Sequence, residues 1–170
     1  MVDRLSKVLV LWLCSSVMLT AQASAPTIFL VRHAERADAG RGGPPMTGAD
    51  PPLSTAGRAR AKALAAVLKD AGIVEIYATE LKRTQRTAAP TAAARGLTVK
   101  TVAADDVAGL VAKLKAATGN VLVVGHSNTV PEIIKSLGVN TPVTIADAEF
   151  DNLFVVVQGV SPRLLRLHYR

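Results

Sequence analysis

The stretch Phe29-Leu30-Val31-Arg32-His33-Ala34-Glu35 decides the fold of this chain. Its apolar half is typical of a buried strand, and the run ends abruptly at an arginine and a histidine. In open α/β sheets, ligand sites gather at the carboxyl ends of the strands. We therefore expect Arg32 and His33 to mark a ligand site there. Neighbouring strand residues point to opposite faces, so both can face one ligand only if the chain turns at His33.

Helix and strand signals alternate along the rest of the chain. Beyond the first strand, strands are expected at 73–79, 97–102, 121–124, 153–157 and 164–168. Helices are expected at 55–71, 81–94, 105–117 and 130–137. The strand at 121–124 is wholly apolar, as in sheets that are covered on both faces. The alternation predicts an α/β fold with three layers, α/β/α, around a mostly parallel central sheet.

Residues 1–25 have the pattern of a signal peptide. Arg4 and Lys7 precede an apolar stretch at 8–19, and small residues at alternating positions follow it. The apolar stretch is shorter than the roughly 20 residues that a membrane-spanning helix needs. We expect cleavage of this leader, export to the periplasm or the medium, and no stable membrane association afterwards. Residues 26–170 then form a single domain. An uncleaved leader that tethers an interaction module to a membrane is the alternative.

The amino-acid composition excludes several kinds of catalytic chemistry and narrows the classes of partner. Cys14 is the only cysteine and lies in the leader, so disulfides, cysteine–zinc clusters and thiol catalysis are excluded for the mature chain. The three histidines lack metal-ligand spacing, and we expect neither a metal nor a cofactor. The net charge is +7, but the basic residues are scattered and only 4% of the residues are aromatic. This pattern favours a small anionic substrate and no nucleic acid.

Polar residues follow three of the expected strands. Arg32 and His33 end the first, Arg83 lies one turn beyond the second, and His126 leaves the apolar strand at 121–124. Two arginines and two histidines at one edge of a sheet suit phosphoryl transfer. Arginine offers a fork of donors that matches phosphate oxygens, and a neutral imidazole can act as the nucleophile. A second histidine can bind an oxygen as charge spreads in the transition state. The arginines also disfavour a protonated His33.

Four blocks of sequence, in order, resemble the histidine phosphatase superfamily, whose fold is that of the phosphoglycerate mutases. They are Arg32-His33-Ala34-Glu35 and residues 53–61, 78–88 and 123–128. Ala34 stands where the superfamily pattern has glycine, and Thr79 where it has serine. The resemblance implies that His33 is the phosphohistidine nucleophile. It also implies that Arg32, Arg83 and His126 bind the phosphoryl group.

The general acid is less clearly marked. The superfamily often places a carboxylate between the arginine block and the second histidine, which makes Asp105 and Asp106 the candidates. Both residues also fit the N-cap of the helix expected there. Glu35 is a further candidate, although it can equally interact with Arg58 or with the loop that follows it. Some compact members, resembling the phosphohistidine phosphatases, lack an obvious acid, because phosphoramidate leaving groups need less help.

The resemblance implies a phosphatase acting on a phosphomonoester or a phosphoramidate, with a phosphorylated small molecule or a phosphoprotein as its partner. The chain is shorter than the phosphoglycerate mutases of the superfamily. A catalytically weak or inactive phospholigand-binding protein of the same fold is the alternative. Residues 37–52 are rich in glycine and proline, so they form either a flap over the site or a surface insertion.

Overall fold

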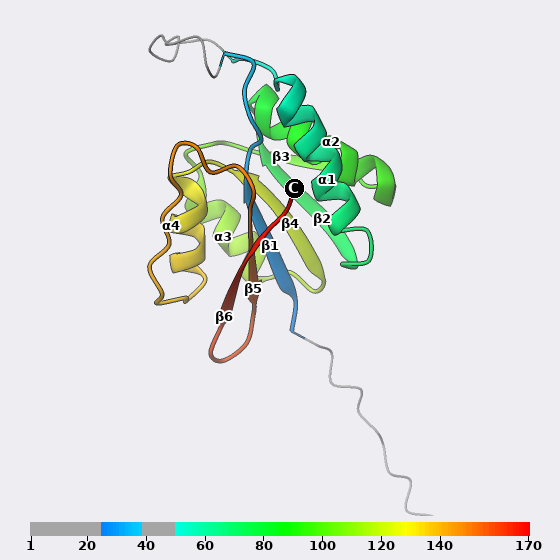
Figure 1. Ribbon diagram of the computed structural model, residues 1–170. Coiled ribbons are helices and arrows are strands. Elements are labelled where there is room, and N and C mark those ends of the chain that lie inside the picture. The colour runs from blue at the N-terminus through cyan, green and yellow to red at the C-terminus, as the bar shows by residue number, and fades with distance from the viewer. Residues whose placement is uncertain (1–24, 39–49) are drawn as a thin grey trace, which may run out of the picture.

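A six-stranded sheet in the order β3-β2-β4-β1-β5-β6 organises the chain (Figure 1). The computed structural model describes residues 25–38 and 50–170. The strands are β1 (Thr27–Arg32), β2 (Ile73–Thr79), β3 (Val99–Val102), β4 (Asn120–Gly125), β5 (Asn152–Val157) and β6 (Arg163–His168). The helices are α1 (Thr55–Val67), α2 (Lys82–Arg95), α3 (Val107–Lys115) and α4 (Thr129–Ser136).

The first four strands run in the same direction. β4 lies between β1 and β2 and pairs in parallel with both, and β3 adds to β2 in parallel. β5 pairs antiparallel with β1, and β6 pairs antiparallel with β5. The expected α/β fold with a mostly parallel sheet is therefore confirmed. In this register Arg32 lies opposite Gly125, so the carboxyl ends of β1 and β4 meet at one edge.

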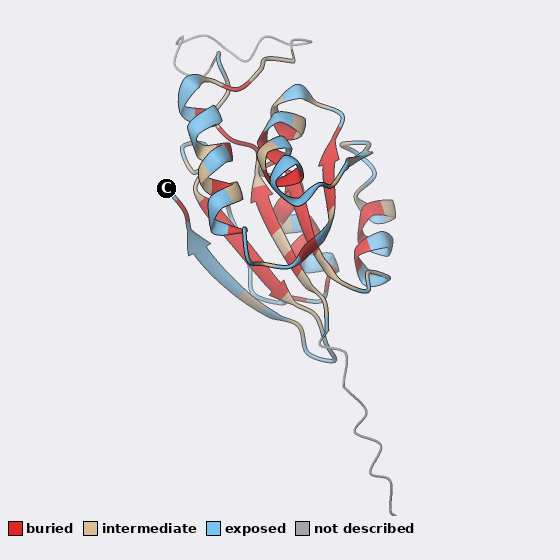
Figure 2. Cartoon of the chain, turned by 90° about the vertical axis from the view of Figure 1, so that its right-hand side faces the viewer, coloured by how far each residue is buried: buried red, intermediate tan, exposed pale blue. Residues whose placement is uncertain are grey.

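The sheet is covered on both faces, with α1 and α2 on one side and α3 and α4 on the other (Figure 1). The side chains of β4 alternate between the two cores. Leu122 packs with Leu64 of α1, whereas Val123 packs with Leu110 of α3 and Ile133 of α4. This explains why the β4 sequence is wholly apolar. Figure 2 shows that β6, at the edge of the sheet, is largely exposed.

Several boundaries differ from those expected. α3 begins at Val107 rather than at residue 105, because Asp106 caps it. α1 ends at Val67, and the chain then turns through Gly72, whose φ of 62° suits glycine. The predicted leader lies outside the described residues, as does most of the 37–52 loop. The two ends of that loop are joined, since the Ala37 N–H donates to the Pro52 carbonyl at 2.8 Å. Within the described part of the chain, no helix is both long and apolar enough to cross a membrane.

Candidate active site

The ends of β1 and β4 bring the two predicted site histidines together. β1 ends at Arg32, and His33 follows it directly, with its N–H donating to the Gly125 carbonyl at 2.9 Å. His126 is the first residue after β4. The two ring centroids lie 5.5 Å apart, with an angle of 62° between the ring planes. The turn at His33 that the sequence required is therefore present.

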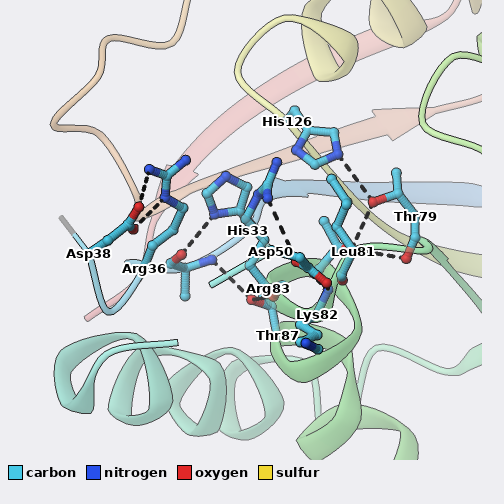
Figure 3. Close-up of polar contacts among 12 residues, drawn as sticks. His33, Arg36, Asp38, Asp50, Thr79, Leu81, Lys82, Arg83, Thr87 and His126 are labelled. Atoms are coloured by element: carbon cyan, nitrogen blue, oxygen red, sulfur yellow. Dashed lines mark hydrogen bonds and ion pairs between the residues drawn. The ribbon is translucent and has the colours of Figure 1, made fainter. Parts of the chain in front are cut away.

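The orientation of the His33 ring is fixed by the backbone of the next residue. Nδ1–H donates to the Ala34 carbonyl at 2.8 Å, because a carbonyl can only accept (Figure 3). The Ala34 N–H donates to Thr87 Oγ1 at 3.0 Å, and that hydroxyl donates to the Arg83 carbonyl at 2.8 Å. Since Nδ1 carries the proton of the neutral ring, Nε2 keeps a free lone pair.

Both imidazoles stay neutral at pH 7. Burial, and to a smaller extent the nearby charge of Arg83, lower the pKa of His33 to about 3. The Ala34 carbonyl opposes this shift without reversing it. Burial and then Arg83 likewise lower the pKa of His126 to about 4. A neutral His33 is a competent nucleophile over the whole physiological range.

His126 is held by β2. Its Nε2 lies 3.1 Å from Thr79 Oγ1, which in turn lies 2.8 Å from Thr84 Oγ1. Figure 3 shows the other ring nitrogen on the side of Arg83. If the Thr79 hydroxyl donates to Nε2, Nδ1 carries the proton and can donate to an oxygen of a bound anion. Thr79 thus fixes the position of the second ring, but its hydroxyl can donate or accept, so it does not fix the tautomer as the Ala34 carbonyl does for His33.

Arg32 is held from one side only. Its Nη1 donates to the carbonyls of Ala146 and Asp147, each at 3.0 Å, and to that of Glu149 at 3.3 Å. Its guanidinium carbon lies 4.2 Å from the centre of the Phe150 ring. Nε, however, is buried and has no hydrogen-bond partner among residues 25–38 and 50–170. The edge formed by Nε and Nη2 is thus left for a ligand.

Arg83 shows the same shortage of acceptors. Its side chain is 15% exposed and its Nη1 lies 3.9 Å from Asp50 Oδ1, while its Nε is buried without a partner in the part of the chain that the structure describes. Burial lowers the pKa of both Arg32 and Arg83, yet arginine remains charged in proteins. Two partly buried cations with unused donors, beside two neutral imidazoles, fit a tetrahedral oxyanion.

The sequence model of the histidine phosphatase superfamily (branch 1) matches residues 28–106, which contain Arg32, His33 and Arg83. The match and the shared set of site side chains support the histidine phosphatase superfamily for this chain. His126 lies beyond the matched segment, and the fold brings it to the other three side chains. Given the superfamily and this set of side chains, the chain is a histidine-type phosphatase, as the sequence predicted.

Solved structures of phosphatases share the fold. The α-ribazole phosphatase from Shigella flexneri has a TM-score of 0.69 at 18% identity, over 84% of this chain and 96% of that chain. The protein histidine phosphatase SixA in complex with tungstate has 0.66 at 18%, over 84% and 96%. Mycobacterial glucosyl-3-phosphoglycerate phosphatase with VO3 has 0.65 at 18%, over 82% and 97%. A comparison with curated protein sequences gives no match.

The two aspartates predicted as candidates for the general acid lie at the start of α3. Asp106 caps α3, with Oδ1 accepting from the Gly109 N–H at 2.9 Å, while Asp105 is exposed. Asp106 also lines a small cavity, together with Thr79 and Gly125. The capping interpretation therefore holds for Asp106, and a role in proton transfer stays a prediction for both aspartates.

Glu35 is engaged elsewhere. Its carboxylate accepts from Arg60 Nε at 2.8 Å and from Arg60 Nη2 at 2.7 Å. Arg58, one of the alternative partners considered for Glu35, turns instead to the Leu53 carbonyl and to Thr55. Among the described residues, Glu35 is therefore paired with Arg60 and hydrogen-bonded to neither site histidine.

Three residues near the site were missed from the sequence. Asp50 accepts from the Lys82 N–H at 2.9 Å and lies beside Arg83 (Figure 3). Phe150 and Glu149 belong to the segment that holds Arg32. The one available signal was the start of α2, where Leu81 has no capping side chain and an acidic partner from elsewhere is therefore needed.

Proposed function

We propose that this protein hydrolyses a phosphomonoester or a phosphoramidate outside the cytoplasm, through a phosphohistidine intermediate on His33. The observation that carries the proposal is the state of the His33 ring. It is neutral and buried, and its Nδ1–H is bound to the Ala34 carbonyl, so that the Nε2 lone pair is free. Two arginines with unused Nε donors lie beside it.

Binding of the phosphoryl group follows from the unused donors. Arg32 offers the edge formed by Nε and Nη2, Arg83 offers Nε, and His126 offers Nδ1 in the tautomer in which the Thr79 hydroxyl donates to Nε2. Two fixed positive charges balance a dianionic phosphate group. The fold already holds the donors in place, so little reorganisation is needed as charge spreads over the phosphoryl oxygens.

Transfer occurs in two displacements at phosphorus. In the first, the Nε2 lone pair of His33 forms a bond to phosphorus while the bond from phosphorus to the leaving oxygen or nitrogen breaks, and its electrons go to the leaving group. In the second, a water molecule attacks the phosphohistidine and the P–N bond breaks. Inorganic phosphate leaves, a proton is released, and neutral His33 is restored.

The leaving group determines how much proton donation is needed. Among the described residues, no carboxylate is hydrogen-bonded to either imidazole. A phosphoramidate nitrogen is basic enough to carry its own proton, whereas an alkoxide is a poor leaving group. SixA is named as a protein histidine phosphatase, whereas the other two neighbours are named for phosphomonoesters. We therefore expect phosphoramidates and aryl phosphates to turn over faster than alkyl phosphates.

The export part of the proposal rests on the leader. The first strand begins at Thr27, so cleavage after Ala23 or Ala25 would leave every described helix and strand intact. Mass spectrometry of the N-terminus of the protein purified from its own host tests this. A chain that still begins at Met1 would contradict export by cleavage and would favour a tethered module.

The decisive experiment measures phosphate release from an aryl phosphate by the intact protein and by His33→Ala. We expect a loss of several orders of magnitude, because the nucleophile is removed. His168→Gln is the matched control, since His168 is half-exposed and paired with Asp151. Equal rates in wild type and His33→Ala would refute the assignment of His33 as the nucleophile. Tight phosphate binding without hydrolysis by the wild type would indicate a phospholigand-binding protein.

A further inference from the structure

Arg32 is held by a segment far away in sequence. Its Nη1 reaches the carbonyls of Ala146, Asp147 and Glu149, more than a hundred positions later, and Phe150 covers its guanidinium plane. We call residues 146–150 the carbonyl cradle. Nη1 has only two hydrogens, and three carbonyls compete for them. The cradle therefore fixes which edge of the guanidinium is turned toward the ligand.

Glu149 closes the cradle on itself. Its Oε2 accepts from the Ala146 N–H at 2.9 Å, and its own N–H donates to the Ala146 carbonyl at 3.0 Å. The cradle contains no regular helix or strand, so these two bonds are what shape it. A freed Glu149 side chain would let the carbonyls of Ala146 and Glu149 move apart, and Arg32 would lose its fixed orientation.

Glu149 is in turn anchored to the outermost strand. Arg166 of β6 donates through Nη2 to both carboxylate oxygens, each at 3.2 Å. Its Nε donates to Asn152 Oδ1 at 2.8 Å, and Asn152 is buried. The charged pair itself is partly exposed, with side chains 37% and 38% accessible. An ion pair this exposed contributes little to global stability, so stability does not explain its role.

We propose that the Glu149–Arg166 pair is a positioning device that orients Arg32 for phosphoryl binding, although neither residue touches the ligand. This inference rests on the proposed function, because it assumes that Arg32 binds the phosphoryl group. The path runs from Arg166 to Glu149, from Glu149 to the carbonyl cradle, and from the cradle to Arg32 Nη1. Arg166 and Glu149 are positioning residues, whereas Arg32 is the residue that meets the anion.

The test measures the affinity for inorganic phosphate by titration calorimetry on the full domain. Arg166→Met removes the anchor, and we expect phosphate binding to weaken about tenfold, because a misplaced donor loses most of its bond. Arg166→Lys should recover part of the loss. Arg163→Met is the matched control, since Arg163 lies on the same strand, is exposed and does not contact Glu149. Glu149→Gln, which keeps the shape and one acceptor, should weaken binding in the same direction and serves if Arg166→Met folds poorly.

A double-mutant cycle separates positioning from a general structural effect. Lysine cannot present the two-donor edge of arginine, so in an Arg32→Lys background Arg166→Met should cost no further affinity. Equal losses in both backgrounds, or equal affinities for Arg166→Met and Arg163→Met, would overturn the proposal, as would a wild type that binds no phosphate. Because binding is measured without turnover, an inactive protein whose phosphate affinity still depends on Arg166 would contradict the proposed function and leave this inference standing.

Discussion

At the scale of single residues, the site is defined by donors that have no acceptor. The Nε atoms of Arg32 and Arg83 are buried and meet no acceptor among the described residues, which is costly for a charged group. One nitrogen of each imidazole beside them has a partner: Nδ1 of His33 donates to the Ala34 carbonyl, and Nε2 of His126 lies within hydrogen-bond distance of Thr79. The unpaired donors of the two arginines therefore favour the binding of one anion at this position. The fold thus preorganises the site for phosphate.

Thr79 offers a test of how His126 is positioned. Thr79→Val keeps the shape of this buried side chain and removes the hydroxyl that contacts Nε2. We expect kcat/KM to fall about tenfold, the cost of losing one hydrogen bond that sets the ring orientation. Thr79→Ser, which restores the residue of the superfamily pattern, should retain most of the activity. An unchanged kcat/KM in Thr79→Val would show that His126 is oriented by the backbone alone.

The sequence predicted which residues meet but not how they are held. Arg32, His33, Arg83 and His126 each follow a periodic strand or lie in a helix, so their location could be inferred from pattern. The residues 146–150 and Asp50 lie in irregular segments, where no periodicity links position to orientation. The unused edge of Arg32 is set by those segments, and it was therefore not predictable.

At the scale of elements, α1 is placed by one glycine. A Cβ at Gly57 would overlap the carbonyl oxygen of Glu35, two residues after His33. The Ser54 N–H donates to that same carbonyl at 2.9 Å. The helix start and the turn after β1 are therefore in direct backbone contact, and Gly57 is the residue that permits it.

Gly57→Ala should therefore destabilise the protein despite the better helix propensity of alanine, which is worth about 1 kcal/mol. We expect a net loss of about 2 kcal/mol in the free energy of unfolding, because backbone must move. Chemical denaturation measures this loss. Ala59→Ser, on the exposed face of the same helix, is the control and should cost less than about 0.5 kcal/mol. Similar stability for the two variants would mean that α1 can shift freely.

Asp50 links the far end of the 37–52 loop to the start of α2. Its carboxylate accepts from the Lys82 N–H and lies 3.9 Å from Arg83 Nη1. A negative charge there competes with an anionic ligand for Arg83. Asp50→Asn keeps an acceptor for Lys82, and we expect phosphate to bind about fivefold more tightly.

Asp70→Asn removes the same charge from an exposed position and is the control for the Asp50 variant. It should leave phosphate affinity unchanged. If Asp50→Asn instead lowers kcat by orders of magnitude with an oxygen leaving group, Asp50 is a proton donor and the competition argument fails.

The directions of the strands were harder to predict from the sequence than the positions of the helices and strands. The apolar β4 and the N-cap Ser54 are visible in sequence, and both lie where they were expected. The antiparallel direction of β5 depends on the route taken by residues 138–151, which contain no helix or strand to show it. The late start of α3 follows from Asp106, which could cap a helix or lie within its first turn.

At the scale of the whole molecule, the two buried histidines of the site make the free energy of unfolding depend on pH. Both ring pKa values, about 3 for His33 and about 4 for His126, lie below the ordinary value of 6.5. Below pH 6.5 the unfolded chain takes up these protons, and the folded protein does not until the pH reaches about 4. Each group therefore stabilises the fold fully above pH 6.5, and its contribution declines as the pH falls toward its folded pKa.

The free energy of unfolding should accordingly fall between pH 6.5 and pH 4, by at most about 1.4 kcal/mol per pH unit for each histidine. Urea denaturation in phosphate-free buffer at several pH values measures the slope. Carboxylates with lowered pKa values, such as Glu75, add a decline of their own at lower pH, so the informative quantity is a difference. In His33→Gln and in His126→Gln the slope near pH 5.5 should be shallower by about one proton. A slope that is identical in wild type and in both variants would mean that the two rings are protonated as easily in the folded protein as in the unfolded chain. The neutral nucleophile would then lose its physical basis.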